Sequence, residues 1–346
     1  MPARKRPADR RAAEQTGGKA LTEDREIRSA IVTGASGAIG MALVHLLLQR
    51  GIRVTILAHR GSKRSRLFPE APRLSVIGCD LDGYDAWNPT ERFDAFFHLA
   101  WTGTYGEARN DYSLQLENIA GTLSAVRLAA RAGCFVFAGA GSQAEYKNVS
   151  SILGPDSEIL PETGYGLAKF TAGRMSAGLC RQLGLRQVWT RFFSVYGPAD
   201  SDRTMVMSGI RAMLDGRVPE YTRGDQLWDY LYSEDAARAM FLAALRGNDQ
   251  AVYCVGSGQA RPLAEYIEEI RDAVGPQARV RLGAIPYYPN QRMHLQADIR
   301  TLTQDTGFRP EIPFSEGIRR TVDWARHNPT QSAGNADRPQ KNQETI

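Results

Sequence analysis

The chain has few residues that bind metals or form disulfides: 4 cysteines and 5 histidines among 346 residues. The cysteines stand far apart in apolar surroundings, and their spacing is not that of metal ligands. We therefore expect buried free thiols and no metal site. Free thiols persist in a reducing compartment, which predicts a cytoplasmic protein. The four cysteines are Cys79, Cys134, Cys180 and Cys254.

Long apolar runs are also missing. No segment approaches the ~20 apolar residues that a membrane-spanning helix needs, and the basic N-terminus leads into no apolar core of a secretory signal. We expect no membrane association. The composition, 42% hydrophobic and 23% charged, is that of an ordinary globular protein, and 346 residues allow one large domain or two.

The positive charge is concentrated at the N-terminus. Of the formal net charge of +5, residues 1–28 contribute +3, from eight Lys/Arg against five Asp/Glu. Because this segment lacks hydrophobic periodicity, we expect a disordered extension rather than a basic face on the fold. A nucleic-acid-binding arm is the alternative, but no nucleic-acid partner is expected. The polar segment 328–346 is likewise expected to be disordered.

A glycine-rich loop follows the first apolar segment. Ser29–Thr33 is typical of a buried strand, the run Gly34-Ala35-Ser36-Gly37-Ala38-Ile39-Gly40 comes next, and Met41–Gln49 is apolar at helical spacing. A strand, a glycine loop and a helix in this order predict a dinucleotide site, with the pyrophosphate at the helix N-terminus. The glycines stand three apart, not in the G-x-G-x-x-G register, and a glycine turn without a ligand is the alternative.

The end of the second expected strand, Val54–Leu57, indicates which nicotinamide cofactor is preferred. A fold that prefers NAD usually has an acidic residue there for the ribose 2′-hydroxyl. This chain has Arg60, with Lys63 and Arg64 beyond it. Cationic groups suit a 2′-phosphate, so we expect NADP(H) to be preferred over NAD(H). A solvated basic loop is the alternative.

Three further strands are expected, and each ends at a polar or glycine-rich segment. Because strands alternate with helical stretches, such as the helix expected from Asn118 to Arg131, the fold class is α/β with a doubly wound parallel sheet. Ligands of such sheets bind beyond the carboxyl ends of the strands. The strands and their ends are Leu74–Gly78 before Asp80 and Leu81, Ala95–Leu99 before Ala100 and Trp101, and Cys134–Ala138 before Gly139 to Ser142, with His98 expected to pack within its strand.

The most informative pair is Tyr165 and Lys169. Four residues apart, they fall on one face of a helix. An ammonium beside a phenol lowers the phenol's pKa, so that Tyr165 can exchange a proton near neutral pH. Chance also produces this spacing, and the pair gains weight from the glycine loop and from Ser142.

Taken together, the motifs resemble the extended short-chain dehydrogenase/reductases of the nucleotide-sugar epimerase/dehydratase type. The similarity covers roughly residues 29–327, in family order. The matching pieces are TGASGAIG at 33–40, DL at 80–81, HLA at 98–100, NIAGT at 118–122, Ser142, YGLAK at 165–169, RFFSVYGP at 191–198, WDYLYSEDAARA at 228–239, YCVGSG at 253–258 and TGFRPEIPFSEGI at 306–318.

This resemblance implies a Rossmann-type domain over 29–198 and a smaller C-terminal substrate domain over 199–327, with 228–246 returning to the large domain. It also implies a homodimer and a catalytic triad in which Tyr165 is the acid/base, Lys169 holds the nicotinamide ribose and tunes Tyr165, and Ser142 binds the reacting oxygen. The cofactor contacts implied by the motifs and the resemblance are Gly34, Ser36, Gly37, Ala38, Ile39, Arg60, Asp80, Leu81, Leu99, Ala100, Tyr165, Lys169 and Phe193.

Departures from the family pattern narrow the reaction. The 4,6-dehydratases of this family carry Asp-Glu after the catalytic Ser/Thr, where this chain has Gln143-Ala144, so dehydration is not expected. The run from Gly141 to Tyr146 resembles 4-ketoreductases of nucleotide-linked deoxysugars. We therefore expect an NADPH-dependent reductase of a nucleotide-linked 4-keto-6-deoxyhexose. A 4-epimerase is the alternative, and a non-catalytic NADP-binding protein is disfavoured by the complete triad.

Two departures concern the substrate side. Ser194 replaces the usual Asn of the R-x-F-N-x-Y-G-P segment, and Trp228 replaces an Arg that commonly meets the diphosphate. Arg223 or Arg292 is the expected source of the missing charge, and either is equally well read as a surface residue. The expected substrate contacts are Trp101, Gln143, Ser194, Arg223, Trp228 and Arg292.

Overall fold

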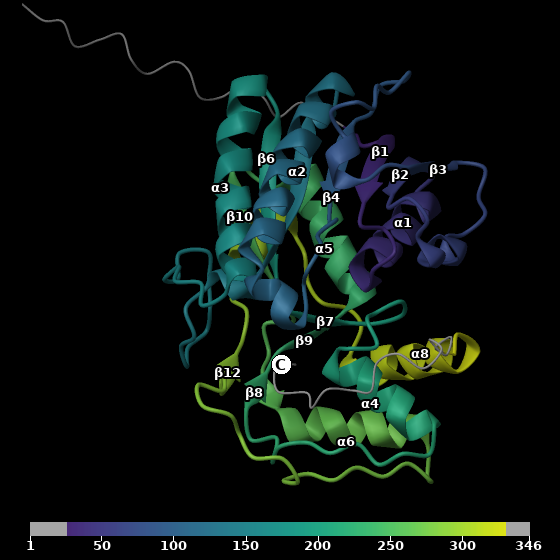
Figure 1. The fold of residues 1–346 in the computed structure, drawn as a ribbon, viewed down its shortest axis with the longest axis vertical. Helices are drawn as coiled ribbons and strands as arrows, with labels where there is room; N and C mark the ends of the chain where they lie inside the picture. The colour runs from purple at the N-terminus through teal and green to yellow at the C-terminus, as the bar shows by residue number, and fades with distance from the viewer. Residues whose placement is uncertain (1–25, 330–346) are drawn as a thin grey trace, which may run out of the picture.

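A seven-stranded parallel sheet forms the centre of the larger lobe in the computed structural model, which describes residues 26–329 (Figure 1). The terminal extensions expected at 1–28 and 328–346 lie almost entirely outside these residues. The strand order, β10-β6-β5-β4-β1-β2-β3, is that of a doubly wound sheet, as the sequence predicts. The strands are β1 (Ser29–Thr33), β2 (Arg53–Ala58), β3 (Leu74–Gly78), β4 (Ala95–His98), β5 (Val136–Ser142), β6 (Arg186–Phe192) and β10 (Ala251–Val255).

Two pairs of helices cover the two faces of the sheet (Figure 1). On one face, α1 and α5 pack over a core that includes Leu43 and Met240. On the other, α2 and α3 pack together over a core that includes Val126 and Cys180. Helices on both faces explain why the central strands are buried. The helices are α1 (Ala38–Gln49), α2 (Tyr112–Arg131), α3 (Gly164–Leu183) and α5 (Ser233–Arg246), and short 3₁₀ turns are η1 (Lys63–Leu67), η2 (Leu81–Gly83), η3 (Gly106–Asn110) and η4 (Gln143–Glu145).

Strand β5 corrects one expectation. The strand expected over Cys134–Ala138 runs instead from Val136 through Ser142, and Ser142 pairs with Phe192 of β6. Gly139 and Gly141 are therefore strand residues, not loop residues. A Cβ atom on either would collide with the indole of Trp189, so the glycines make room for this ring.

Helix α2 begins earlier than the expected start at Asn118. The carboxylate of Asp111 accepts a hydrogen bond from the amide of Leu114 at 3.1 Å and caps the helix at Tyr112. Asn118 lies inside the helix, where its side chain donates to the carbonyl of Thr102 and accepts from the Thr102 amide. The asparagine thus holds the loop after β4 rather than starting the helix.

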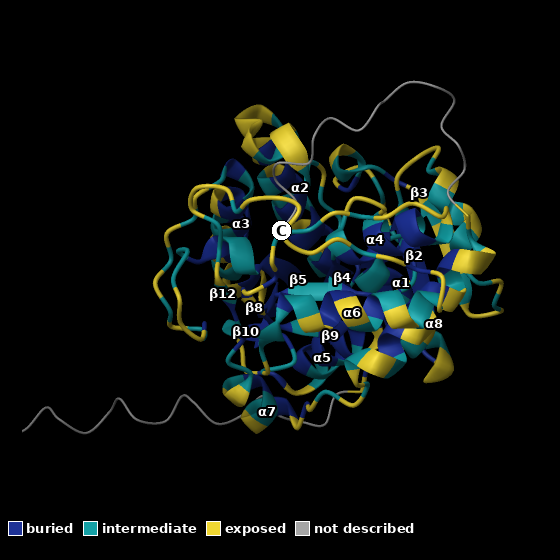
Figure 2. Ribbon diagram, turned by 90° about the horizontal axis from the view of Figure 1, so that it is seen from below, coloured by how far each residue is buried: buried dark blue, intermediate teal, exposed yellow. Residues whose placement is uncertain are grey.

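A smaller lobe lies against the carboxyl ends of the large sheet (Figure 1). Its core joins α4, α6 and α8 through residues such as Met207, Ile270 and Val322. Figure 2 shows α6 with its exposed residues on one side and its buried residues on the other. The elements are β7 (Ser194–Tyr196), α4 (Met205–Leu214), β8 (Leu227–Trp228), β9 (Tyr230–Tyr232), β11 (Arg261–Pro262), α6 (Leu263–Val274), β12 (His294–Leu295), α7 (Arg300–Thr306) and α8 (Phe314–His327).

The segment that returns to the larger lobe is longer than 228–246. Helix α5 packs on α1, and β10, at Ala251–Val255, pairs with β6 at the edge of the large sheet. Helix α7 then packs on α5. The chain therefore crosses between the lobes several times, and this brings loops of both lobes to the carboxyl ends of the strands. Across residues 26–329, no helix is long and apolar enough to span a membrane.

Candidate active site

The glycine loop between β1 and α1 has the shape that a dinucleotide requires. Gly34 has φ +69°, and a Cβ there would lie 2.5 Å from the backbone nitrogen of Ala100. Gly37 precedes α1, and no side chain caps the helix N-terminus. The first amides of α1 are thus open to an anion. The loop with Ser36, followed by Ala38 and Ile39 in the first turn of α1, fits a nicotinamide dinucleotide.

The ends of β2 and β3 lie side by side, as expected for the adenosine end of such a site. The Asp80 carboxylate accepts a hydrogen bond from the backbone amide of Arg60 at 3.0 Å and contacts the His59 ring. The Arg60 amide and the His59 side chain lower the pKa of Asp80. The Arg60 side chain is 70% exposed, and its Nε donates to the carbonyl of Gly78 at 3.3 Å. Arg64 points elsewhere, because its guanidinium donates to the carbonyl of Ala199.

The loop after β4 is held by the side chain of Thr33, the last residue of β1. Thr33 Oγ1 accepts hydrogen bonds from the amides of Leu99 and Ala100, both at 3.2 Å, and is 2.9 Å from Nδ1 of His98. His98 is buried, and burial lowers its pKa to about 3, with Lys169 as a second cause. A neutral imidazole between Thr33 and Thr122 is a packing histidine, as the sequence predicts.

Ser142, at the end of β5, is positioned by a buried ion pair. The Glu145 carboxylate accepts a hydrogen bond from the backbone amide of Ser142 at 2.9 Å, from Trp189 Nε1 at 3.0 Å and from Arg191 Nε at 2.7 Å. Glu145 is completely buried and Arg191 nearly so. Ser142 Oγ accepts a hydrogen bond from the amide of Ala144 at 3.2 Å and also interacts with Tyr165. The serine hydroxyl and the tyrosine phenol therefore meet at the end of β5.

Tyr165 and Lys169 lie on the first turns of α3, whose N-terminus is capped by Thr163. Lys169 is buried, and its Nζ donates to the carbonyl of Ala140 at 2.7 Å. The same atom is 3.8 Å from the ring centroid of Trp101 and 5.9 Å from that of Tyr165. Burial lowers the pKa of Lys169 to about 7, although Glu145 opposes this shift.

The electrostatics of Tyr165 correct the expectation from the Tyr-Lys spacing. Burial raises the pKa of Tyr165 above its ordinary value. Two interactions act in the opposite direction, first the hydrogen bond with Ser142 and then the charge of Arg109, whose Cζ is 4.7 Å from the Tyr165 ring centroid. The Lys169 ammonium is nearer to the Trp101 ring than to the Tyr165 ring. The four-residue spacing of Tyr165 and Lys169 therefore does not by itself bring the lysine charge next to the phenol.

A cavity of about 510 Å³ opens beside these residues and extends between the two lobes. Its wall includes Arg109, which contacts the Tyr165 ring, Gln143 and Ala144, which follow Ser142 in the chain, and Phe193. The remaining lining residues are Tyr105, Asn110, Tyr146, Asn148, Glu162, Thr163, Ser194, Val195, Asp200, Thr204, Met205, Val206, Trp228, Tyr230, Tyr288, Asn290 and Arg292.

Of the six expected substrate contacts, four line the cavity, whereas Arg223 and Trp101 do not; the Trp101 ring lies against Lys169. Ser194, Trp228 and Arg292 line the cavity together with Gln143. Trp228 is 2% exposed and donates its Nε1–H to Ser194 Oγ at 2.7 Å, so the two departures from the family pattern contact each other. Arg223 is on the surface, where it pairs with Asp225 at 2.9 Å. Of the two arginines, Arg292 is therefore the one in the cavity.

Arg292 has the environment of an anion-binding residue. Its Nη1 is inaccessible to solvent and has no hydrogen-bond partner among residues 26–329. Burial lowers its pKa, and Glu162 and Tyr288 partly oppose this effect. A buried guanidinium nitrogen without a partner is costly unless a ligand supplies an acceptor.

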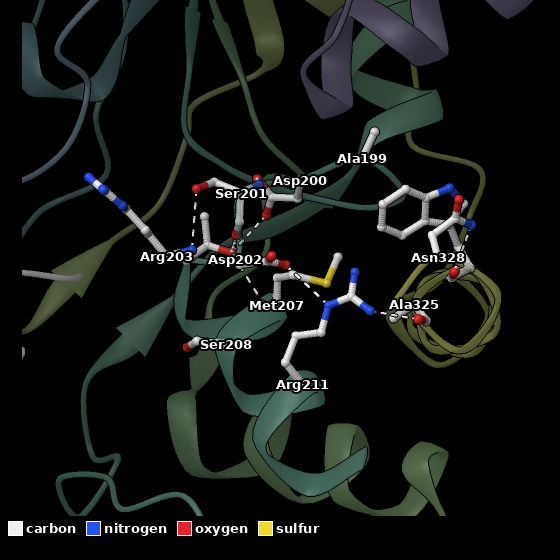
Figure 3. A network of polar contacts seen from close by, with 12 residues as sticks. Ala199, Asp200, Ser201, Asp202, Arg203, Met207, Ser208, Arg211, Ala325 and Asn328 are labelled. Carbon is white, nitrogen blue, oxygen red and sulfur yellow. Dashed lines mark hydrogen bonds and ion pairs between the residues drawn. The ribbon is translucent and has the colours of Figure 1, made fainter. Parts of the chain in front are cut away.

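The segment after β7 forms another wall of the cavity and is anchored to α4 and α8 (Figure 3). Asp200 accepts from the amide of Ser201 at 2.7 Å and from Thr204 Oγ1 at 2.9 Å. Arg211 of α4 joins Asp202 at 3.1 Å and donates to the carbonyl of Ala325 in α8 at 2.6 Å. Burial raises the pKa of Asp200 to about 6.

A family model described as "NAD dependent epimerase/dehydratase family" matches residues 30–256. The chain belongs to this family. The family consists of extended short-chain dehydrogenase/reductases, which confirms the resemblance inferred from the motifs and the expectation of an enzyme.

Similar proteins include a dehydratase by sequence and an epimerase that shares the fold. A dTDP-glucose 4,6-dehydratase from Streptomyces antibioticus is 26% identical over 320 residues, covering 86% of this chain and 92% of that protein. MoeE5, solved in complex with UDP-glucuronic acid and NAD, is 26% identical with a TM-score of 0.75 and covers 86% of this chain and 99% of the MoeE5 chain. A UDP-glucose 4-epimerase from Thermotoga maritima shares the fold, with a TM-score of 0.78 at 21% identity. The match covers 86% of this chain and 99% of the epimerase chain.

Several residues of the cavity in this family member carried no signal in the sequence. Arg109 and Tyr105 lie in or beside η3, and Glu162 and Tyr288 lie in segments without regular secondary structure. No motif marks these residues. Asp200 is the exception, because it stands two residues after the YGP segment, and its position after β7 gives a reason to expect it near the cavity.

Proposed function

We propose that this family member is an NADPH-dependent reductase of a nucleotide-linked keto-sugar, with a 4-keto-6-deoxyhexose as the preferred substrate. One observation carries the proposal. Ser142, Tyr165 and Lys169 come together beside a cavity whose wall, immediately after Ser142, consists of Gln143 and Ala144. A proton donor for a carbonyl oxygen is thus present, while the acid and base needed to remove water at the neighbouring carbons are absent from positions 143 and 144.

The roles of the residues follow from their positions. A bound reduced nicotinamide supplies the hydride that the carbonyl carbon accepts. Tyr165 gives its phenolic proton to the carbonyl oxygen, while the Ser142 hydroxyl donates a hydrogen bond to this oxygen as negative charge develops there. Lys169 is directed at the same end of the site and holds the cofactor ribose. Glu145 cannot take part in proton transfer, because its carboxylate is committed to Arg191.

We also propose a preference for NADPH over NADH. The side chain of Arg60 is exposed at the end of β2, where the ribose 2′-substituent of a dinucleotide lies in such folds. Its guanidinium suits a phosphate dianion. Arg64 is bound to Ala199, so the proposal rests on Arg60, with exposed Lys63 beside it.

The diphosphate of the substrate is assigned to Arg292. Arg292 lines the cavity, its Nη1 is buried without a hydrogen-bond partner among residues 26–329, and the neighbouring Tyr288 and Asn290 supply further polar groups. A guanidinium binds phosphate oxygens in two-point contact, which would satisfy this nitrogen. Ser194 and Trp228, already hydrogen-bonded to each other, form an uncharged part of the wall.

A screen with nucleotide-linked 4-keto-6-deoxysugars tests the proposal. We expect stoichiometric loss of the NADPH absorbance at about 340 nm and, by NMR, a product with a hydroxyl at the former keto carbon. A 4-epimerase remains the second candidate, because the same three residues, Ser142, Tyr165 and Lys169, serve the oxidation and re-reduction of a single sugar carbon. Interconversion of two hydroxy-sugars with no net consumption of NADPH would establish the epimerase and overturn the reductase.

A homodimer through α2 and α3 completes the proposal. Several apolar residues on these helices are exposed, with exposed fractions of 64% for Leu116, 49% for Leu167 and 48% for Met175. Burying such a face against its own copy is favourable. Phe170 and Leu179 contribute less, because both are partly buried within the subunit. Light scattering at micromolar concentration should give twice the mass of one chain, and a monomer would contradict this assignment.

A further inference from the structure

Arg109 places a positive charge beside the phenol of Tyr165, and no motif in the sequence indicates it. The residue lies in η3, lines the cavity, and has its Cζ 4.7 Å from the Tyr165 ring centroid. One of its nitrogens, Nη1, donates to the carbonyl of Thr104 at 3.2 Å. Within residues 26–329 the guanidinium forms no ion pair with a carboxylate.

Arg109 is held in this place by the backbone around it. The neighbouring Asn110 accepts a hydrogen bond from the amide of Gly164 through its side-chain oxygen, at 3.0 Å. Gly164 is the first residue of α3, the helix that carries Tyr165. The turn bearing the guanidinium and the helix bearing the phenol are therefore joined directly, one residue away from each group.

Lys169, the other cation near Tyr165, is engaged differently. Its Nζ donates to the carbonyl of Ala140, and the π face nearest to it is that of Trp101, at 3.8 Å. The Tyr165 ring centroid is 5.9 Å away. The Trp101 ring in turn lies edge-on to Tyr165, with centroids 6.0 Å apart. The lysine charge is thus directed mainly at the indole and at the strand end.

We propose that Arg109 is a positioning residue that stabilises the phenolate form of Tyr165 when this tyrosine releases its proton. The inference deepens the proposed reductase and rests on it. As the proton passes to the carbonyl oxygen of the substrate, the phenol oxygen retains the electron pair and the ring becomes anionic. A guanidinium over the ring face is attracted more strongly to this anion than to the neutral ring. Solvent returns the proton to Tyr165 after the reaction.

The other titratable groups around Tyr165 do not replace Arg109. Glu145, behind Ser142, opposes phenolate formation, but its charge is balanced by Arg191. The other titratable groups near Tyr165 are Tyr105 and Lys169. Tyr105 stays protonated, since burial raises its pKa to about 12. Arg109 forms no ion pair with a carboxylate among the residues that the structure describes, and its charge offsets part of the burial that raises the pKa of Tyr165.

The first test follows the Tyr165 phenol by spectroscopy and needs no turnover. Tyrosinate absorbance near 295 nm is titrated in the full chain and in Tyr165→Phe, and the difference isolates Tyr165. In Arg109→Gln and Arg109→Met we expect this transition to move to higher pH by about one unit, the lower end of the effect of a nearby charge. Arg109→Lys should keep it within a few tenths of a unit. Arg319→Gln, which removes an exposed arginine of α8, is the matched control.

The second test uses the pH profile of NADPH-dependent reduction. Because the reaction requires protonated Tyr165, turnover falls as pH rises through the pKa of Tyr165. Without Arg109 this descending limb should move to higher pH, while the plateau falls on the order of tenfold because the phenol is a weaker acid. A variant that is only partly folded loses turnover at every pH, and the descending limb of its pH profile stays at the same pH.

The outcomes separate this inference from the proposed function. A 295 nm transition that stays in place in folded Arg109→Gln and Arg109→Met overturns the inference, and so does a transition in Arg109→Lys that moves as far as in Arg109→Gln. Circular dichroism shows which of the three Arg109 variants are folded, and the test remains possible if one of them is not. If the transition moves but no keto-sugar is reduced, the role of Arg109 stands and the reductase fails.

Discussion

Two parts of the cavity wall are built in different ways, one beside the reacting groups (the reaction end) and one formed by loops (the loop end). At the reaction end, Ser142 and Tyr165 belong to a strand and a helix, and the strand is supported by the buried pair of Glu145 and Arg191. At the other end, Arg292 and Tyr288 lie in segments without regular secondary structure. From this difference we infer that helices and strands position the reacting groups, whereas loops bind the rest of the substrate.

The largest effect expected at the reaction end is on turnover. Tyr165→Phe removes the proton donor and should lower the reduction rate by about 10²- to 10⁴-fold. The affinity for NADPH, measured by fluorescence titration, should hardly change, because the ring and its contacts with Arg109 and Trp101 remain. A variant that keeps more than a tenth of the wild-type rate would remove Tyr165 from the mechanism.

The next effect is on stability. Glu145→Gln leaves the buried guanidinium of Arg191 without a counterion, and we expect the free energy of unfolding to fall by about 3 kcal/mol. Urea denaturation measures the change. The matched control is Glu158→Gln, which breaks the exposed pair with Lys147 and should cost less than about 1 kcal/mol. Equal losses in both variants would show that the reaction end has no special support.

At the loop end, the expected effect is on substrate affinity. Arg292→Met removes the charge assigned to the diphosphate and should raise the KM for a nucleotide-linked sugar about 10- to 100-fold, with a smaller change in kcat. Arg223→Met serves as the control, because Arg223 pairs with Asp225 outside the cavity. If the loss falls on kcat rather than KM, the two ends of the cavity do not have separate tasks.

The smallest effect is expected at the adenosine end. Arg60→Ala should weaken NADPH about tenfold and leave NADH nearly unchanged, since the guanidinium is assigned to the 2′-phosphate alone. Isothermal titration with both cofactors measures the ratio. Equal affinities for the two cofactors in the unmodified protein would end the proposed preference before any variant is made.

The sequence predicted what is local and could not predict what depends on distant contacts. The glycine loop and the Tyr165–Lys169 pair were identified because their residues are close in the chain and their spacing reflects one turn or one helix face. Gly139 and Gly141 indicated a loop, because glycine is unfavourable in a strand unless another group needs the space. The group that needs it, the indole of Trp189, is about 50 residues away and is visible only in the structure.

The same distinction explains the arginines. Arg223 and Arg292 are equivalent as sequence, since neither stands in a periodic segment, and only the fold separates a surface pair from a cavity residue. Arg109 has no motif at all, because its relation to Tyr165 arises where η3 packs on the start of α3. It was therefore harder to predict from the sequence where the positive charges of the site lie than to predict Ser142, Tyr165 and Lys169.

The hydrogen bond between Trp228 and Ser194 has a consequence for mutagenesis of the cavity wall. Each residue departs from the family pattern, and each would look like a lost function if it were judged alone. Because the indole nitrogen donates to the serine hydroxyl at 2.7 Å, the two substitutions form one polar unit within the cavity wall. Their effects should be non-additive: Trp228→Arg or Ser194→Asn changes the size and polarity of one partner of this hydrogen bond while the other is still shaped to fit the original, whereas the double variant changes both partners together.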